Sequence, residues 1–171
     1  MQGMMMHRPL RIIDILIHAA AAHRGAEVVS ARVEGDRHRQ SYADTLDRAA
    51  QLAHALADLG IRTGDRVATL AWNGHRHLEL YFGVSGMGAV CHTINPRLSA
   101  EQMLYILRHA DDRLLCADLT FLPMLEAMAD QLPPGLRIVA LCAADALPDS
   151  PLDLIAYESL LDGWPACYDW P

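Results

Sequence analysis

The sequence predicts an α/β fold in which a layered, mainly parallel sheet has helices on both faces, preceded by an N-terminal helix and an edge β-hairpin. Several short apolar runs are continuous rather than alternating, as in strands that are buried on both faces. They span residues 66–71, 89–93, 113–117 and 137–141. Segments with helical periodicity separate these runs, and this alternation is typical of right-handed strand–helix–strand crossovers. The chain has 171 residues, 52% of them hydrophobic, which is enough for one domain with a buried core.

The elements before the sheet follow from spacing and turn chemistry. Apolar residues within 12–20 recur at intervals of three and four, which predicts an amphipathic helix. Extended runs over 28–33 and 37–42 flank a turn that contains Gly35, and this pattern predicts a hairpin. Its polar composition indicates an edge position.

Helices are expected between the strands. They span residues 42–59, 75–87, 99–109 and 119–132. Ser41 and Ser99 stand at the start of the first and third of these helices and are typical N-cap residues.

The alternation of predicted strands and helices ends near residue 141, and the division into domains follows from this. We expect residues 1–141 to form a first α/β lobe and residues 142–171 to form an irregular tail with one short helix over 155–161. Trp164 and Trp170 lie in this tail without periodicity, so we expect an uncovered apolar surface there and a chain that continues in a larger protein.

Composition excludes several classes of function. Fourteen basic residues stand against 21 acidic ones, for a net charge of −7, which argues against a nucleic-acid-binding surface. All of the basic residues are arginine, so the chain can form neither a lysine Schiff base nor a Walker phosphate loop. The arginines are spread over predicted helices and turns among an excess of acids. A convergent phosphate clamp is therefore not expected, and we expect this chain by itself to bind ATP negligibly.

Cysteine usage and hydropathy indicate a cytoplasmic location. The four cysteines lack a CxxC pair and read as reduced thiols, mostly in the core. The apolar run at 12–22 is interrupted by Asp14 and His18 and is preceded by methionines rather than by a basic segment, so no signal peptide is predicted. No apolar stretch is long enough to predict a transmembrane segment.

The glycines of the segment GVSGMG at 83–88 do not have the spacing of a dinucleotide-binding turn, and they end a predicted helix instead of opening one. We interpret them as positions of close packing between a helix and the sheet, followed by a turn.

Cys91 and His92 are adjacent in a predicted strand and so point to opposite faces. They cannot form a nucleophile–base pair, and packing is the favoured role for Cys91.

His75, His77 and Glu79 resemble metal ligands, but only His75 and Glu79 share a helix face. A solvated helix start is favoured over a metal site. No catalytic, cofactor-binding or metal-binding residue is predicted on this chain.

The segment HTINPRL at 92–98 lies at the carboxyl end of a predicted buried strand, where open parallel sheets place ligand sites. Asn95 and Pro96 are also typical turn residues, and the turn interpretation is favoured. Three carboxylates that flank the next strand are interpreted as solvated turn residues: Asp111, Asp112 and Asp118.

Two segments carry a family resemblance: GDRVATLAWN at 64–73 and HTINPRLSAEQ at 92–102. With the hairpin and helix entry VEGDRHRQSYADTLDRAAQLAHAL, they resemble the N-terminal part of bacterial fatty-acyl-CoA ligases of the adenylate-forming superfamily. The resemblance covers nearly the whole chain. The family-motif residues, to which it assigns only a scaffold role, are Gly64, Asp65, Asn73, Asn95, Pro96, Arg97 and Leu98.

The resemblance implies a two-step reaction in the full-length ligase. A carboxylate attacks ATP to give an acyl-adenylate and pyrophosphate, and the thiol of CoA then displaces AMP. ATP, Mg²⁺ and CoA are implied for that enzyme, while the phosphate loop and the catalytic lysine of the family would lie beyond residue 171. We therefore expect no cofactor to bind this chain alone, and no activity from it.

Two other interpretations stay open at this stage: a stand-alone interaction or dimerisation module, and a small-ligand-binding domain that uses the sheet edge near Asn95. The expected partners are the rest of the ligase or a second copy in a homodimer, with a fatty acid as the substrate of the full enzyme. The sequence does not determine the acyl-chain length.

Overall fold

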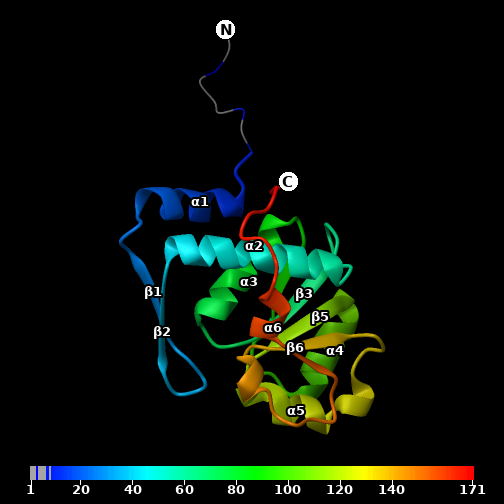
Figure 1. Ribbon diagram of the computed structural model, residues 1–171. Coiled ribbons are helices and arrows are strands. Elements are labelled where there is room, and N and C mark those ends of the chain that lie inside the picture. Colours follow the sequence, from blue (N-terminus) through cyan, green and yellow to red (C-terminus); the bar gives the residue numbers. More distant parts are fainter. Residues whose placement is uncertain (1–2, 4–6, 8) are drawn as a thin grey trace.

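The computed structural model describes residues 3, 7 and 9–171. Helix α1 (Ile12–Ala22) comes first and is followed by an antiparallel hairpin of β1 (Glu27–Ala31) and β2 (Arg37–Ser41). Helix α2 (Tyr42–Asp58) then leads into the main sheet. The hairpin forms a two-stranded sheet of its own and extends along one side of the molecule (Figure 1).

The main sheet has five strands in the order β4-β3-β5-β6-β7, all parallel. The strands are β3 (Arg66–Leu70), β4 (Val90–Thr93), β5 (Asp112–Ala117), β6 (Arg137–Ala140) and β7 (Leu154–Ala156). The helices after α2 are α3 (His75–Gly86), α4 (Ala100–Ala110), α5 (Leu122–Ala127) and α6 (Tyr157–Leu161). The predicted parallel sheet is confirmed for all of the apolar runs that the sequence indicated.

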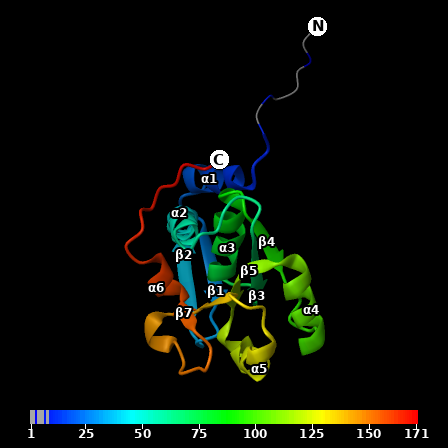
Figure 2. The same cartoon turned by 90° about the vertical axis from the view of Figure 1, so that its right-hand side faces the viewer.

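Helices cover both faces of this sheet, as predicted. One core joins Val67 and Leu114 of the sheet to Leu56 of α2 and Leu80 of α3. The other core lies between the opposite face and helices α4 and α5. In Figure 2, α2 and α6 lie on one side of the strands and α4 on the other. Alternate residues of a strand point to opposite faces, so a continuous apolar run fills both cores.

Both predicted N-caps are present. The hydroxyl of Ser41 accepts a hydrogen bond from the backbone N–H of Asp44, and Ser99 makes the equivalent bond with Gln102. In each case the side chain of Asp44 or Gln102 accepts a hydrogen bond from the backbone N–H of the capping serine. Both helix starts are therefore capping boxes.

The region 119–171 needs two corrections. The helix expected over 119–132 is broken into η1 (Leu119–Phe121), α5 and η2 (Ala129–Gln131). Residues 142–171 are not simply irregular, because they contain η3 (Ala144–Ala146), the fifth strand β7, and α6. Strand β7 is only three residues long, too short for periodicity to reveal, and it forms by pairing with β6.

The aromatic tail is not an uncovered surface, so that expectation was wrong. Trp170 packs against the core formed by α1, α2 and α3, and the guanidinium of Arg11 donates a hydrogen bond to its carbonyl oxygen at 2.9 Å. The ring of Trp164 stacks on His54 of α2, with 6.0 Å between ring centroids. The C-terminal segment therefore runs back over α2 and ends beside α1 (Figures 1 and 2).

Candidate functional site

The carboxyl ends of β3, β4 and β5 meet at one edge of the sheet. We call the segments that follow them, residues 71–74, 94–98 and Asp118, the carboxyl-edge loops. Backbone bonds extend the strand pairing into them: the N–H of Ile94 donates to the Thr69 oxygen at 2.8 Å, and that of Asp118 to the Leu70 oxygen at 3.0 Å. Open parallel sheets bind ligands at this edge.

In the second loop, Asn95 and its neighbours form a turn. The side-chain oxygen of Asn95 accepts a hydrogen bond from the backbone N–H of Arg97 at 3.0 Å, and its carbonyl oxygen accepts one from Leu98 at 3.2 Å. Pro96 lies between them and is half-buried. The turn interpretation accounts for these contacts, while the side chains of Asn95 and Arg97 remain exposed at the edge.

The other family-motif residues do not gather at one place. Asn73 is exposed in the loop between β3 and α3. Gly64 and Asp65 lie at the opposite, amino end of β3, where Gly64 has a φ of +85° and Asp65 accepts the backbone N–H of Arg62 at 2.8 Å. The motif GDRVATLAWN therefore holds both ends of one strand, and a scaffold role for it stays a prediction.

Two of the carboxylates interpreted as solvated are buried, which corrects that interpretation. Asp118 is 8% exposed, and its carboxylate accepts the backbone N–H of Trp72 at 2.6 Å. Burial raises the pKa of Asp118 to about 6, against the lowering effects of the Trp72 bond and of Arg76. Asp112 is 5% exposed and lies 2.9 Å from Nδ1 of His92, and burial raises its pKa too. Asp111 is exposed, as expected, beside Arg66.

The start of α3 is also buried, so the predicted solvated helix start is wrong. His75 stacks on His38 with 3.8 Å between ring centroids, and burial lowers its pKa to about 3. Nε2 of His77 lies 3.0 Å from the Thr69 hydroxyl, and Nδ1 lies 3.3 Å from the Trp72 oxygen. Burial lowers the pKa of His77, so the ring is neutral and fixes the first carboxyl-edge loop by hydrogen bonds to both groups.

Glu79 is the centre of a buried polar network. It is fully buried and accepts hydrogen bonds from Gln40 at 2.9 Å, Arg48 at 2.8 Å and the hydroxyl of Tyr157 at 2.8 Å. Burial and this carboxylate together raise the pKa of Tyr157 well above its ordinary value. The network joins the hairpin, α2, α3 and α6, which are far apart in sequence.

Arg76 continues the network to the hairpin tip. It donates to Glu158 at 2.8 Å, to Glu34 at 2.7 Å and to the Leu141 oxygen at 2.8 Å. Burial alone would raise the pKa of Glu158, but Arg48 and Arg76 hold it below its ordinary value. Nη2 of Arg76 and Oε2 of Glu34 are buried without a hydrogen-bond partner among the described residues. They line a cavity of about 30 Å³, which is large enough for one water-sized polar group.

Two side chains at this edge, Asp118 and His77, hydrogen-bond the backbone of Trp72 and so position the first carboxyl-edge loop. The described residues contain no group of three His, Cys, Asp or Glu side chains that could hold a metal ion. Thr69 beside His77 is 1% exposed and therefore out of reach of a substrate. Sequence reasoning did not single out Arg76 and placed Glu79 on a solvated helix start, because charged residues are seldom buried. The one sequence signal of their burial was their spacing, because positions 76, 79, 80 and 83 lie on the same, inner face of α3.

The interpretation of the 83–88 glycines as packing positions is confirmed, with one change of partner. A Cβ on Gly83 would lie 2.8 Å from Leu52 and 3.0 Å from the Ala49 oxygen, so the close neighbour is α2 rather than the sheet. Gly88 has a φ of +90° in the turn before β4.

Cys91 packs on the core and burial raises the pKa of its thiol to about 11, as suits a packing residue.

Asp118 gives the protein a testable pH dependence. The folded chain holds this proton up to about pH 6, whereas the ordinary pKa is 3.8. More protons are bound in the folded state between these values, so this group lowers stability as the pH rises from about 4 to about 6. Asp118→Asn keeps an acceptor for the Trp72 N–H but cannot titrate, and we expect it to lack this decline and to be more stable than the parent chain at neutral pH.

Urea unfolding at a series of pH values between 4 and 7 measures this effect. Asp111→Asn is the control, because Asp111 is exposed, and it is expected to keep the parent profile. A parent-like slope in Asp118→Asn would show that Asp118 is ionised throughout this range.

Comparison with known proteins gives the class. A family model described as AMP-binding enzyme matches residues 16–157, most of the chain. Among solved structures, an anthranilate CoA ligase in complex with anthranoyl-AMP superimposes with a TM-score of 0.79 at 23% identity, over 95% of this chain and 30% of that one. A Mycobacterium tuberculosis fatty acyl CoA synthetase does so with a TM-score of 0.70 at 25% identity, over 94% of this chain and 29% of that one. The chain belongs to the AMP-binding enzyme family.

Within that family, several curated relatives are acyl-CoA ligases, which confirms the resemblance found in the sequence. A 3-methylmercaptopropionyl-CoA ligase of Ruegeria pomeroyi is 43% identical over 100% of this chain. A medium-chain-fatty-acid CoA ligase of Ectopseudomonas oleovorans is 41% identical over 100%, and a long-chain-fatty-acid CoA ligase of Thermus thermophilus is 49% identical over 75%. The chain spans 32%, 32% and 24% of their respective lengths, about a third or less.

Proposed function

We propose that this chain is part of an AMP-forming ligase that joins an aliphatic carboxylic acid to CoA. Identities of 41–49% to ligases named for medium-chain fatty, long-chain fatty and methylmercaptopropionic acids carry this proposal. In the proposed reaction the substrate carboxylate attacks the α-phosphorus of ATP and releases pyrophosphate. The thiol of CoA then replaces AMP at the acyl carbon to give the thioester.

The residues of this chain do not fit the triphosphate and metal part of that reaction. The chain has no lysine, and its described residues contain no metal-ligand cluster. We therefore derive no step of the reaction from this chain. We propose that ATP, Mg²⁺ and CoA are bound by parts of the ligase outside these 171 residues, and that the chain supports them through the carboxyl-edge loops.

The proposal also covers partners and location. None of the helices formed by the described residues is long and apolar enough to cross a membrane. A cytoplasmic location is proposed because all four cysteines are free thiols. The proposed partners are the rest of the ligase or a second copy of it. Ile12 and Ile15 on the outer side of α1, 47% and 62% exposed, support an interface at that helix.

Pyrophosphate release tests the proposed function. With ATP, Mg²⁺, CoA and a series of fatty acids of increasing chain length, we expect acid-dependent release of pyrophosphate and AMP from the full-length ligase that contains this chain. We expect none from the 171-residue chain alone, because we propose that the groups that bind ATP and Mg²⁺ around the reacting α-phosphate lie outside it. Release from the chain alone would contradict its inactivity, and no release from the full-length ligase with any acid would contradict the proposed function.

A further inference from the structure

A second cavity, of about 650 Å³, lies at the opposite edge of the sheet, where β5 and β6 begin. Its walls come from the turn between α2 and β3, the end of α4 and the Pro-Pro-Gly turn before β6. Its volume falls in the range of small-molecule sites. This cavity is independent of the carboxyl-edge loops and of the proposed ligase function.

Arg113 reaches this cavity through an irregularity in the sheet. Arg66 of β3 pairs with Asp112 of β5, and Val67 pairs with Leu114, so Arg113 is the extra residue of a β-bulge. A bulge changes the direction of a side chain that regular alternation would send to the other face. Arg113 makes no hydrogen bond or ion pair with any of the described residues, and the residue is exposed. A guanidinium carries five N–H donors.

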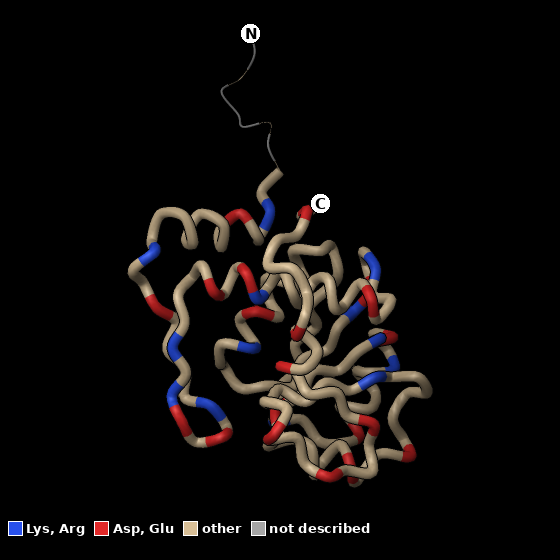
Figure 3. The backbone as a smooth tube through the Cα atoms, in the orientation of Figure 1, with Lys and Arg blue, Asp and Glu red and all other residues tan. Residues whose placement is uncertain are grey.

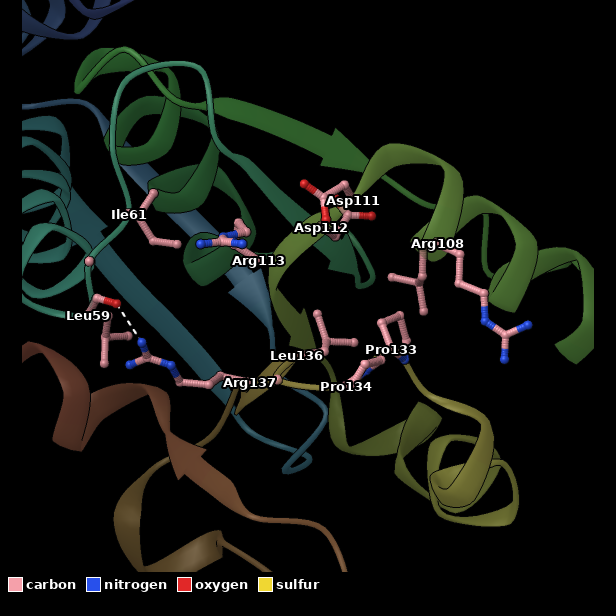
Figure 4. A pocket seen from close by; sticks show the side chains of 13 residues that line it. Leu59, Ile61, Arg108, Asp111, Asp112, Arg113, Pro133, Pro134, Leu136 and Arg137 are labelled. Carbon is pink, nitrogen blue, oxygen red and sulfur yellow. Dashed lines mark hydrogen bonds between the residues drawn. The ribbon is translucent and has the colours of Figure 1, made fainter.

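Arg137 supplies a second guanidinium on the same side of the cavity. It is the first residue of β6 and pairs in register with Leu114, next to the bulge. One of its nitrogens donates to the carbonyl oxygen of Leu59 at 2.6 Å, which fixes the side chain and leaves its other donors available. Figure 4 shows the guanidiniums of Arg113 and Arg137 on the side of Leu59 and Ile61, whereas Arg108 extends away from them.

The acidic residues in the wall already have partners. Asp111 pairs with Arg66 at 2.7 Å, and Asp112 lies 2.9 Å from His92. Neither of them is paired with Arg113 or Arg137. Figure 3 shows several basic segments on this side of the sheet, with acidic segments among them. The sheet register places Arg113 and Arg137 on neighbouring strands, although they are 24 positions apart in the sequence.

We propose that this cavity binds a small phosphorylated molecule, with a phosphate monoester group between Arg113 and Arg137. A phosphate monoester carries nearly two negative charges at neutral pH and three acceptor oxygens, which matches two fork-shaped guanidiniums. A carboxylate would neutralise only one of them. The less polar part of the ligand would lie on the apolar wall formed by Leu107, Pro133 and Leu136.

Phenyl phosphate is a suitable probe, because it combines a phosphate monoester with a compact apolar body. We expect saturable binding to the purified protein by calorimetry, weaker binding of inorganic phosphate, and no comparable binding of benzoate. Arg113→Ala is expected to weaken phenyl phosphate binding at least about tenfold, since it removes charge-assisted hydrogen bonds. Arg113→Lys keeps the positive charge but loses the fork-shaped pair of N–H donors. We expect it to bind phenyl phosphate with an affinity between those of the parent chain and of Arg113→Ala.

Arg39→Ala is the matched control, because Arg39 is an exposed arginine of the hairpin, and binding should stay unchanged. Arg113 is exposed and unpaired, so its variants should fold like the parent chain, which circular dichroism checks. Absence of saturable binding, binding that Arg113→Ala leaves intact, or equal binding of benzoate would each overturn the proposal.

Discussion

Replacing Glu79 with alanine is expected to lower the free energy of unfolding by about 3–5 kcal/mol, because it removes the shared partner of a buried ionic network. Arg48, Gln40 and Tyr157 all donate to this carboxylate, and Glu79 itself is fully buried. Without this carboxylate, the buried hydroxyl of Tyr157 has no hydrogen-bond acceptor, and Arg48 keeps only its hydrogen bond to Glu158. Urea unfolding followed by circular dichroism measures the change.

Glu27→Ala is the matched control for this experiment. Glu27 also pairs with an arginine, Arg39 at 2.8 Å, but both side chains are more than half exposed. Surface ion pairs contribute little, and we expect an effect below about 1 kcal/mol. If Glu79→Ala and Glu27→Ala had similar small effects, the network around Glu79 would not hold the four elements together.

Replacing Gly83 with valine is expected to destabilise the chain by about 3 kcal/mol through overpacking between α3 and α2. A Cβ at this position would lie 3.0 Å from the backbone oxygen of Ala49, which cannot move without distorting α2, and 2.8 Å from Leu52. Valine adds two further carbons to that contact. The gain from replacing a helical glycine is at most about 1 kcal/mol and does not compensate.

Gly25→Val serves as the comparison, because nothing lies within 4 Å of a Cβ built at Gly25. We expect its unfolding midpoint to stay close to that of the parent chain. A stable Gly83→Val variant would mean that α2 and α3 can separate, and would remove the packing interpretation of the 83–88 glycines.

Much of the fold could be predicted because its elements are locally encoded. The strands β3, β4, β5 and β6 could be recognised because each is a continuous apolar run in the sequence. The starts of two helices could be recognised because Ser41 and Ser99 are N-cap residues. Strand β7 could not be found in this way. Its three residues become a strand only by pairing with β6.

The candidate site was less predictable, because it depends on burial. His75, Glu79, Asp112 and Asp118 have the composition of a solvated surface, and the sequence favoured that interpretation for all of them. The structure buries each one. A buried polar group needs a partner, and the partners come from distant segments, as with Glu79 and Tyr157, which are 78 residues apart.

The sequence by itself determined the layered parallel architecture, the membership of an acyl-CoA ligase family, and the absence of lysine chemistry. Each of these depends on residue identity or on spacing between near neighbours. Only the tertiary structure decided which charges are buried and which stay free. Arg76 is neutralised by two glutamates while Arg113 is left unpaired at a bulge, because strand register and helix packing, rather than local sequence, set the distances between charged groups.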